Sequence, residues 1–473
     1  PADLITVFER PLGRCAGILA VIAVAHSLLS WRLAGWEASH RPLVAACVGG
    51  AITLLLSART MKVTQRLSRA RLFVYLGCAA LAGGCLAGAG RVWGFHALAP
   101  VLGMVSLMLG LVGLVLLESA AAELGGTQAG GLRRVYGEPM SHSALALPVF
   151  AVLLAFVNSL PHVISDFARL ANPALLGDAS LEPLAATLLI TSIVYLVSVR
   201  AMRERIWLHP SVILGSLGML VLVESTLRLH SGLFILATVL LMNLLVGVAR
   251  LIQRSERRVE LLLGISKGDC ERPFYNWPSV VTAAVVLGQG IFFCLTLLGL
   301  ASPREPHWPW ALTPVLACGL FLHLFYLERR RSYVHVLIAS SLLGCLGAAA
   351  SSGWTLTPDI AVATLGLLWG IVAAGLASPR GDRVLRGMRL RMEKEERSTL
   401  SQATAGWSAG LLVFALAVTV PTWMQIEPVF PSTGLTLLLV TFGCAVGGYV
   451  WRRVELEAVA AVLLLAGICA TLV

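Results

Sequence analysis

Fifteen apolar segments, each 17 to 22 residues long, follow one another along this 473-residue chain. A helix needs about 20 apolar residues to cross the hydrocarbon core of a bilayer. Within these segments the apolar runs are continuous, without the strand-like alternation that indicates a membrane barrel. The sequence therefore predicts an all-α, polytopic integral membrane protein with about 15 transmembrane helices. The predicted spans are 13–33, 42–58, 71–89, 97–117, 145–165, 183–199, 211–229, 232–250, 279–300, 309–326, 333–350, 359–377, 405–424, 430–450 and 456–473.

The composition excludes a single water-soluble globule. Hydrophobic residues make up 57% of the chain and charged residues only 13%, whereas soluble domains are about 25% charged. The ten cysteines occur singly, with no CxxC pair. This pattern is typical of small packing residues, and it gives no basis for a disulfide framework or a zinc site. We expect no cofactor and no metal.

The distribution of Lys and Arg predicts the orientation of the chain. With the N-terminus in the cytoplasm, 30 of the 36 basic residues fall on the cytoplasmic side, as the positive-inside rule requires. The net charge of +11 then reflects topology, so we expect no nucleic-acid partner. A chain rich in Arg, Ala and Leu but poor in Lys favours a GC-rich bacterial genome, and hence a bacterial cytoplasmic (inner) membrane.

An internal repeat is indicated by four spans that begin at a proline and end on arginine. The prolines are separated by 141, 126 and 119 residues (183 − 42, 309 − 183 and 428 − 309), or about four helices. Proline is tolerated in the first turn of a helix because its missing N–H would have no partner there. These prolines are Pro42, Pro183, Pro309 and Pro428.

Because each repeat has an even number of helices, successive repeats enter the membrane in the same direction and are parallel. The predicted organisation is repeat 1 at 1–120, repeat 2 at 121–265, repeat 3 at 266–380, and a surface segment with an incomplete repeat 4 at 381–473. The last repeat has only three helices. We expect either that the sequence is part of a longer protein, which we favour, or that a partner supplies the missing helix.

Polar residues inside a bilayer are costly and are candidates for function. The first helices of repeats 1 to 3 each carry one near the middle: His26, Asn158 and Gln289. If the repeats surround a common axis, these side chains line one cavity and bind a substrate. The alternative is that each makes a single interhelical hydrogen bond.

Two segments outside the spans are further candidates. Residues 378–400 alternate apolar residues with Arg383, Arg386, Arg389 and Arg391, a pattern that favours a helix lying on anionic lipid at the cytoplasmic face. The alternative is a solvated continuation of a neighbouring helix. The loop 161–183 carries His162, Asp166, Asp178 and Glu182, which a membrane enzyme acting on a lipid-linked substrate would use, although nothing fixes their geometry.

Functionally, no chain of ionisable residues crosses the predicted membrane, which disfavours a proton pump or an ion-coupled antiporter. Small residues at three- and four-residue spacing, as in LAGGCLAGAG at 81–90, favour close helix packing within the chain or against membrane protein partners. The sequence thus favours a non-catalytic scaffold or subunit of a larger membrane or envelope assembly. The alternatives are a transporter or flippase for a lipid-like or weakly polar substrate, and the membrane enzyme described above.

Overall fold

The computed structural model describes the chain in a series of helical ranges. The described residues form helices, some of them linked by short turns, without a strand among them. Twelve of these helices are long and apolar enough to cross a membrane, so the protein is an all-α, multi-pass membrane protein. The described residues are 15–26, 36–62, 67–92, 97–122, 133–168, 181–229, 231–297, 308–351, 358–378, 383, 394–424, 431–451 and 454–472.

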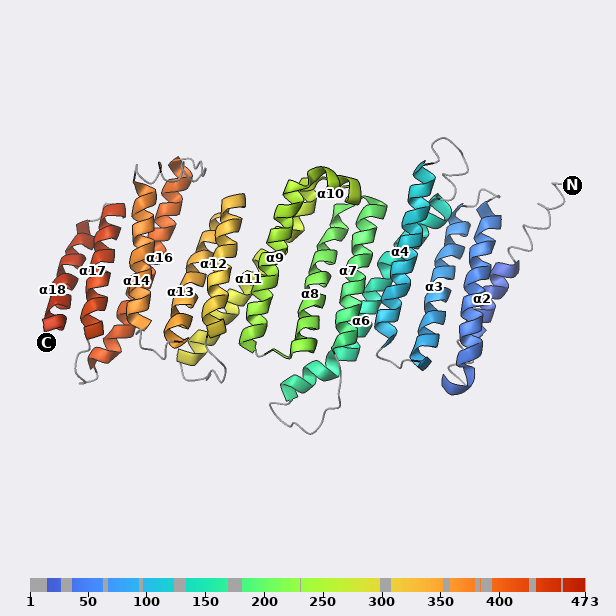
Figure 1. Cartoon of the computed structure of the whole chain (residues 1–473), viewed down its shortest axis with the longest axis horizontal. Helices are drawn as coiled ribbons and strands as arrows, with labels where there is room; N and C mark the ends of the chain where they lie inside the picture. The colour runs from blue at the N-terminus through green and yellow to red at the C-terminus, as the bar shows by residue number, and fades with distance from the viewer. Residues whose placement is uncertain are drawn as a thin grey trace. The chain divides into compact units, whose positions relative to one another are not determined.

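Each of the fifteen predicted spans overlaps a described helix, the first of them being Cys15–His26. The number that cross the membrane and their orientation stay predictions. The other helices are α2 (Trp36–Lys62), α3 (Leu67–Val92), α4 (Leu98–Ala122), α6 (Glu138–Ala168), α7 (Glu182–Met202), α8 (Leu208–Leu227), α9 (Ser231–Arg254), α10 (Glu256–Leu263), α11 (Lys267–Leu297), α12 (Trp308–Glu328), α13 (Arg331–Ser351), α14 (Pro358–Ala377), α16 (Lys394–Met424), α17 (Pro431–Trp451) and α18 (Val454–Leu472) (Figure 1).

The chain divides into two compact units. Unit 1 comprises residues 1–228 and 248–277, and unit 2 comprises residues 229–247 and 278–473. Their boundaries pass through α9 and α11, within the predicted second and third repeats. The repeat boundaries stay a prediction.

In unit 1, the hairpin of α7 and α8 is held by hydroxyl groups that bond to backbone carbonyls. Thr187 donates to the Pro183 carbonyl of its own helix at 2.6 Å. Across the hairpin, the Ser192 hydroxyl donates to the Ser211 carbonyl at 2.8 Å, and the Ser211 hydroxyl donates back to the Ser192 carbonyl at 2.9 Å. The helix α7 ends at Arg203, whose φ is +56°.

In unit 2, the hairpin of α12 and α13 has counterparts of two of these contacts 126 residues later (for example 318 − 192). Thr313 donates to the Pro309 carbonyl at 2.7 Å, and the Cys318 thiol lies 3.6 Å from the Leu337 carbonyl. The turn after α12 again contains a left-handed arginine, Arg329 at φ +52°. The interval equals the one between the second and third prolines, so these contacts support the predicted repeat.

A second contact recurs between the third helix of one predicted repeat and the first helix of the next. In unit 1, the Tyr75 hydroxyl lies 2.9 Å from His142 Nδ1, joining α3 to α6. Also in unit 1, Trp277 Nε1 of α11 donates to the Ser216 hydroxyl of α8 at 2.7 Å. The contact in unit 2 joins α13 to α16 and forms part of the groove described below.

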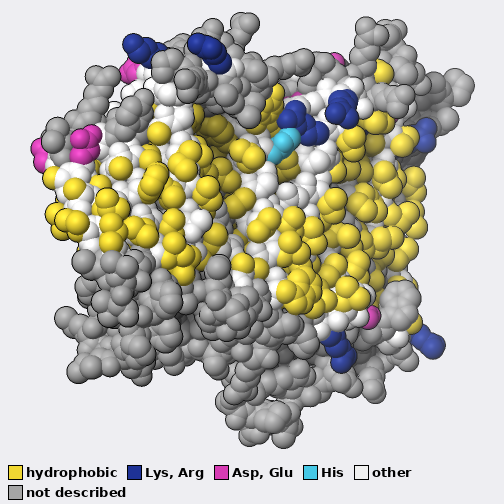
Figure 2. All heavy atoms as spheres, turned by 60° about the vertical axis from the view of Figure 1, so that its left-hand side comes forward, with side chains coloured by type: hydrophobic (Ala, Val, Ile, Leu, Met, Phe, Trp, Pro, Cys, Tyr) yellow, Lys and Arg dark blue, Asp and Glu magenta, His cyan; other side chains and the backbone are white. Residues whose placement is uncertain are grey.

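The surface agrees with a bilayer environment. Figure 2 shows hydrophobic side chains over the middle of the visible helices, with most of the visible Lys and Arg side chains nearer the helix ends. In the apolar stretch of each membrane-spanning helix, between 28% and 50% of the residues are buried inside the protein. The remaining apolar faces are therefore the ones that contact lipid.

One expectation about helix starts is changed by the structure. The helix α2 begins at Trp36, so Pro42 lies inside it and is not in its first turn as predicted. The predicted position in the first helical turn is right for Pro183 and Pro309, each of which is the second residue of its helix. Pro428 lies outside the described residues, and α17 begins at Pro431.

Two segments between the predicted spans contain helical residues. Before α6, a π-helical turn at Arg133–Gly137 leads directly into that helix. Arg71 of α3 holds this turn, because its side chain bonds to the Arg134 carbonyl at 2.8 Å and to the Glu138 carboxylate at 2.6 Å. From Lys394 onward, the predicted surface segment is already the first part of α16.

Candidate functional site

The three predicted substrate-binding residues have different environments. His26 is exposed at the end of the helix Cys15–His26, and Asn158 is half-buried in α6; both belong to unit 1. Gln289 of α11 belongs to unit 2 and is only 1% exposed. The shared cavity that would join the three stays a prediction.

Gln289 is the polar side chain whose environment most needs an explanation. Its Oε1 and Nε2 atoms are both buried without a hydrogen-bond partner. Two turns earlier on α11, the Thr282 hydroxyl is buried in the same way. Together with Val286 and Phe293, they form the buried stripe of α11. Because an unpaired buried amide costs roughly 1 to 3 kcal/mol, water or a ligand that bonds to Gln289 would stabilise the folded protein.

An open groove of about 670 Å³ lies between α11, α13 and α16 in unit 2. Its walls are apolar for most of their length, with Leu and Phe side chains from all three helices. Its depth comes from Gly290, Gly406 and Gly410, around which a Cβ atom would meet nothing within 4 Å. The lining residues are Gly290, Phe293, His335, Leu342, Leu343, Leu346, Ala403, Gly406, Trp407, Gly410, Leu411 and Phe414.

The polar side chains of this groove are His335 and Trp407. Trp407 Nε1 donates to His335 Nδ1 at 2.8 Å. Because Nδ1 accepts this bond, the neutral imidazole carries its proton on Nε2 and presents a second donor. Arg331, at the start of α13, is four residues before His335 and therefore on the same face of the helix. The groove thus combines a long apolar wall with hydrogen-bond donors near the first turn of α13.

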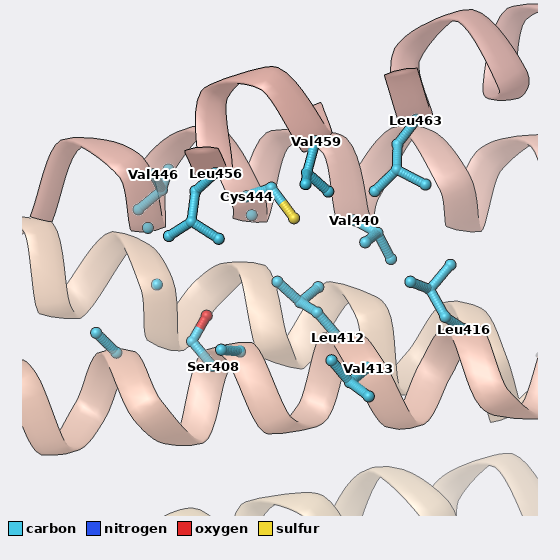
Figure 3. Close-up of a pocket in the computed structure, with 15 residues that line it drawn as sticks. Ser408, Leu412, Val413, Leu416, Val440, Cys444, Val446, Leu456, Val459 and Leu463 are labelled. Atoms are coloured by element: carbon cyan, nitrogen blue, oxygen red, sulfur yellow. The ribbon is translucent and has the colours of Figure 1, made fainter. Parts of the chain in front are cut away.

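A smaller cavity of about 200 Å³ lies between α14, α16, α17 and α18, also in unit 2. Figure 3 shows Leu412 and Leu416 of α16 on one side of it and Leu456 and Leu463 of α18 on the other. The Ser408 hydroxyl in its wall donates to the Gly366 carbonyl at 2.6 Å. With its hydroxyl already bonded, the wall offers a ligand almost solely apolar contacts.

In unit 1, charged side chains gather where α7 and α10 end and α11 begins. Arg200 bonds to Glu118 at 2.6 Å and to the backbone carbonyl of Leu262 at 3.1 Å. Arg205 bonds to Asp269 at 2.5 Å. These bonds join the ends of α4, α7 and α10 and the start of α11, so the cluster explains how these helix ends are held in place.

Several predicted positions lie largely outside the described residues. Of the predicted membrane-surface arginines, Arg383 is exposed, whereas 386, 389 and 391 are not described. In the candidate enzyme loop, Glu182 is exposed in the first turn of α7, and Asp178 is not described. Within the described ranges, no three His, Cys, Asp or Glu side chains are placed to hold a metal ion.

Comparisons give no relative for this chain: no known family, no curated protein and no solved structure matches it. The candidate site therefore rests on geometry alone. Sequence reasoning identified Gln289 but missed the groove beside it. A signal was present in GWSAG at 406–410, because two glycines four residues apart give a helix a shallow face.

Proposed function

We propose that this protein is a non-catalytic multi-pass scaffold or subunit of a larger membrane or envelope assembly, in the bacterial inner membrane. The observation that supports this is how buried polar groups are used. In unit 1, the Ser106 hydroxyl of α4 donates to the Ala144 carbonyl of α6 at 2.7 Å. In unit 2, Ser401 of α16 donates to the Ala373 carbonyl of α14 at 2.8 Å. These hydroxyls hold helices together and leave little polar capacity for chemistry.

The test is gentle extraction of the protein from its native membrane, followed by native gels and mass spectrometry of what co-migrates. A scaffold is expected to retain a fixed stoichiometric set of membrane proteins. Extraction in a harsher detergent is the control, because it should release those partners. A lone monomer or a homo-oligomer in the mild detergent would contradict the proposal.

A second candidate function, a transporter or flippase for a lipid-like or weakly polar substrate, is favoured by Gln289. Its unpaired amide is retained in an apolar helix at a cost to stability, as expected for a group that bonds to a substrate in transit. In proteoliposomes that carry a fluorescent lipid, Gln289→Leu should abolish transport. The same variant should be at least as stable as the parent, because it removes two unpaired polar atoms.

Asn243→Leu is the matched control for this second candidate. Asn243 is also a half-buried amide in a span of unit 2, but its Nδ2 already donates to the Val239 carbonyl at 2.9 Å. Its replacement is expected to preserve transport. Equal transport by the Gln289→Leu variant and the parent would rule out a path through Gln289.

A further inference from the structure

We propose that the groove between α11, α13 and α16 binds a phosphate-bearing lipid, with an acyl chain along its apolar wall and the phosphate near Arg331 and His335. This goes beyond the proposed function, because it assigns a ligand to one site whether or not the protein has protein partners. The proposal rests on three features of unit 2: the shape of the groove, the polarity of its end near the first turn of α13, and the charge of Arg331.

The shape suits a flexible chain. The groove is open along one side. Because Gly406 and Gly410 have no side chains, it is deep at these positions and runs between bulkier residues such as Leu411 and Phe414. Phe414 is 41% exposed despite its size. In a bilayer, an unfilled apolar groove forfeits dispersion contacts, which an acyl chain restores without any rearrangement of the helices.

The end of the groove nearest the first turn of α13 suits a phosphate. His335 presents an Nε2 donor because Trp407 occupies its Nδ1 acceptor. Trp side chains such as Trp407 are enriched at the membrane interface, where lipid headgroups lie. The first turn of α13 adds the positive end of the helix dipole, which favours an anion.

The charges around Arg331 leave it uncompensated. Its neighbour Arg330 is paired with Glu328 at 2.9 Å, and Glu328 also accepts a bond from the Tyr333 hydroxyl at 2.8 Å. Among the described residues, Arg331 has no acidic partner, so a phosphate is the ligand that this position complements.

The combination of an apolar groove with the charge of Arg331 favours a lipid over a transmembrane helix as the occupant. An apolar helix would cover Gly406 and Gly410 but would leave the Arg331 guanidinium without an anion. A phospholipid satisfies both ends of the site at once. The site therefore predicts preference for an anionic lipid over a zwitterionic one with identical chains.

The test uses the purified full chain in mild detergent, with native mass spectrometry to count the retained lipids and a thermal shift to measure binding. The probes are phosphatidylglycerol, phosphatidylcholine with the same chains, and inorganic phosphate. Gly410→Leu fills the groove and should weaken phosphatidylglycerol binding by about tenfold or more. Gly319→Leu is its matched control, since Gly319 of α12 also has open space around it but does not line the groove.

Arg331→Gln should weaken phosphatidylglycerol binding by about tenfold, as expected for one charge-assisted contact, and should weaken phosphatidylcholine binding less, because the choline cation offsets the charge of its phosphate. Arg330→Gln removes the same charge one residue earlier and should change binding by less than about twofold. Equal effects of Gly410→Leu and Gly319→Leu would overturn the proposal. So would a shift that inorganic phosphate reproduces in the Gly410→Leu variant, or a co-purifying polypeptide, in place of lipid, that Gly410→Leu displaces.

Discussion

The hairpins α7–α8 and α12–α13 are equivalent in register, but different side chains make the contacts between their helices. In unit 1, two serines exchange hydroxyl-to-carbonyl bonds across the hairpin at 2.8 and 2.9 Å. In unit 2, the equivalent positions are Cys318 and Leu337, and a single weak thiol contact of 3.6 Å remains. The register is kept although the bonds are not. Small side chains and first-turn prolines therefore set the geometry of these hairpins, and interhelical hydrogen bonds contribute less.

The comparison is tested most strongly at two glycines 126 residues apart. A Cβ on Gly218 would lie 3.0 Å from the backbone nitrogen of Leu189, whereas a Cβ on Gly344 would have ordinary contacts of 3.7 Å. Gly218→Ala should destabilise the protein by about 1 to 3 kcal/mol through overpacking. Gly344→Ala should be neutral, or stabilising by up to about 1 kcal/mol from helix propensity.

The measurement is the free energy of unfolding from SDS titration in mixed detergent micelles, with both alanine variants compared to the parent. Similar effects of the two substitutions would show that the hairpins are packed alike, contrary to the distances around these glycines.

The left-handed arginines test whether the two turns are equivalent. Arg203 and Arg329 have φ values of +56° and +52°, a conformation that costs a non-glycine residue about 1 kcal/mol. Arg203→Gly and Arg329→Gly should each stabilise the protein by about that amount in the same titration. A gain in one turn and a loss in the other would mean that one arginine side chain makes a contact that outweighs its backbone strain.

The serine pair provides a smaller test. Ser192→Ala should cost about 0.6 kcal/mol, the average for an interhelical hydrogen bond in a membrane protein. Cys318→Ser at the equivalent position should change the free energy of unfolding by no more than about that amount. A loss of several kcal/mol at Ser192 would instead make the hydrogen bonds the main determinant of register.

The smallest expected effect concerns a helix end in unit 1. Arg71 and Glu138 are both about one-third exposed, at 35% and 33%, so solvent screens their attraction. Arg71→Gln should cost about 0.5 kcal/mol, and less at high salt. Unfolding measured at low and high ionic strength checks this, with Arg330→Gln as a comparison in unit 2. A cost that does not depend on salt would assign the role of Arg71 to its bond with the Arg134 carbonyl.

Much of the fold could be read from the sequence because hydrophobic length decides it. Each predicted span overlaps a described helix, and the prolines of two spans are in the first helical turn as expected. Pro42 was misplaced because the six polar and aromatic residues before it (WEASHR) are also helical, and no local signal separates a helix from its continuation beyond the membrane. Likewise, residues 133–144 and 256–263 are helical, although they are too polar to be predicted as membrane spans.

The sequence alone determined that this chain is a helical membrane protein, because burying so many apolar residues with so few charges has no other solution. It also marked Gln289, since an amide in an apolar run is conspicuous. Only the tertiary structure brought Trp407 to His335, 72 residues away, and left an open groove beside them. A hydropathy pattern specifies which residues face away from water, whereas the faces that pair and the gaps between them depend on side-chain shapes that meet only after folding.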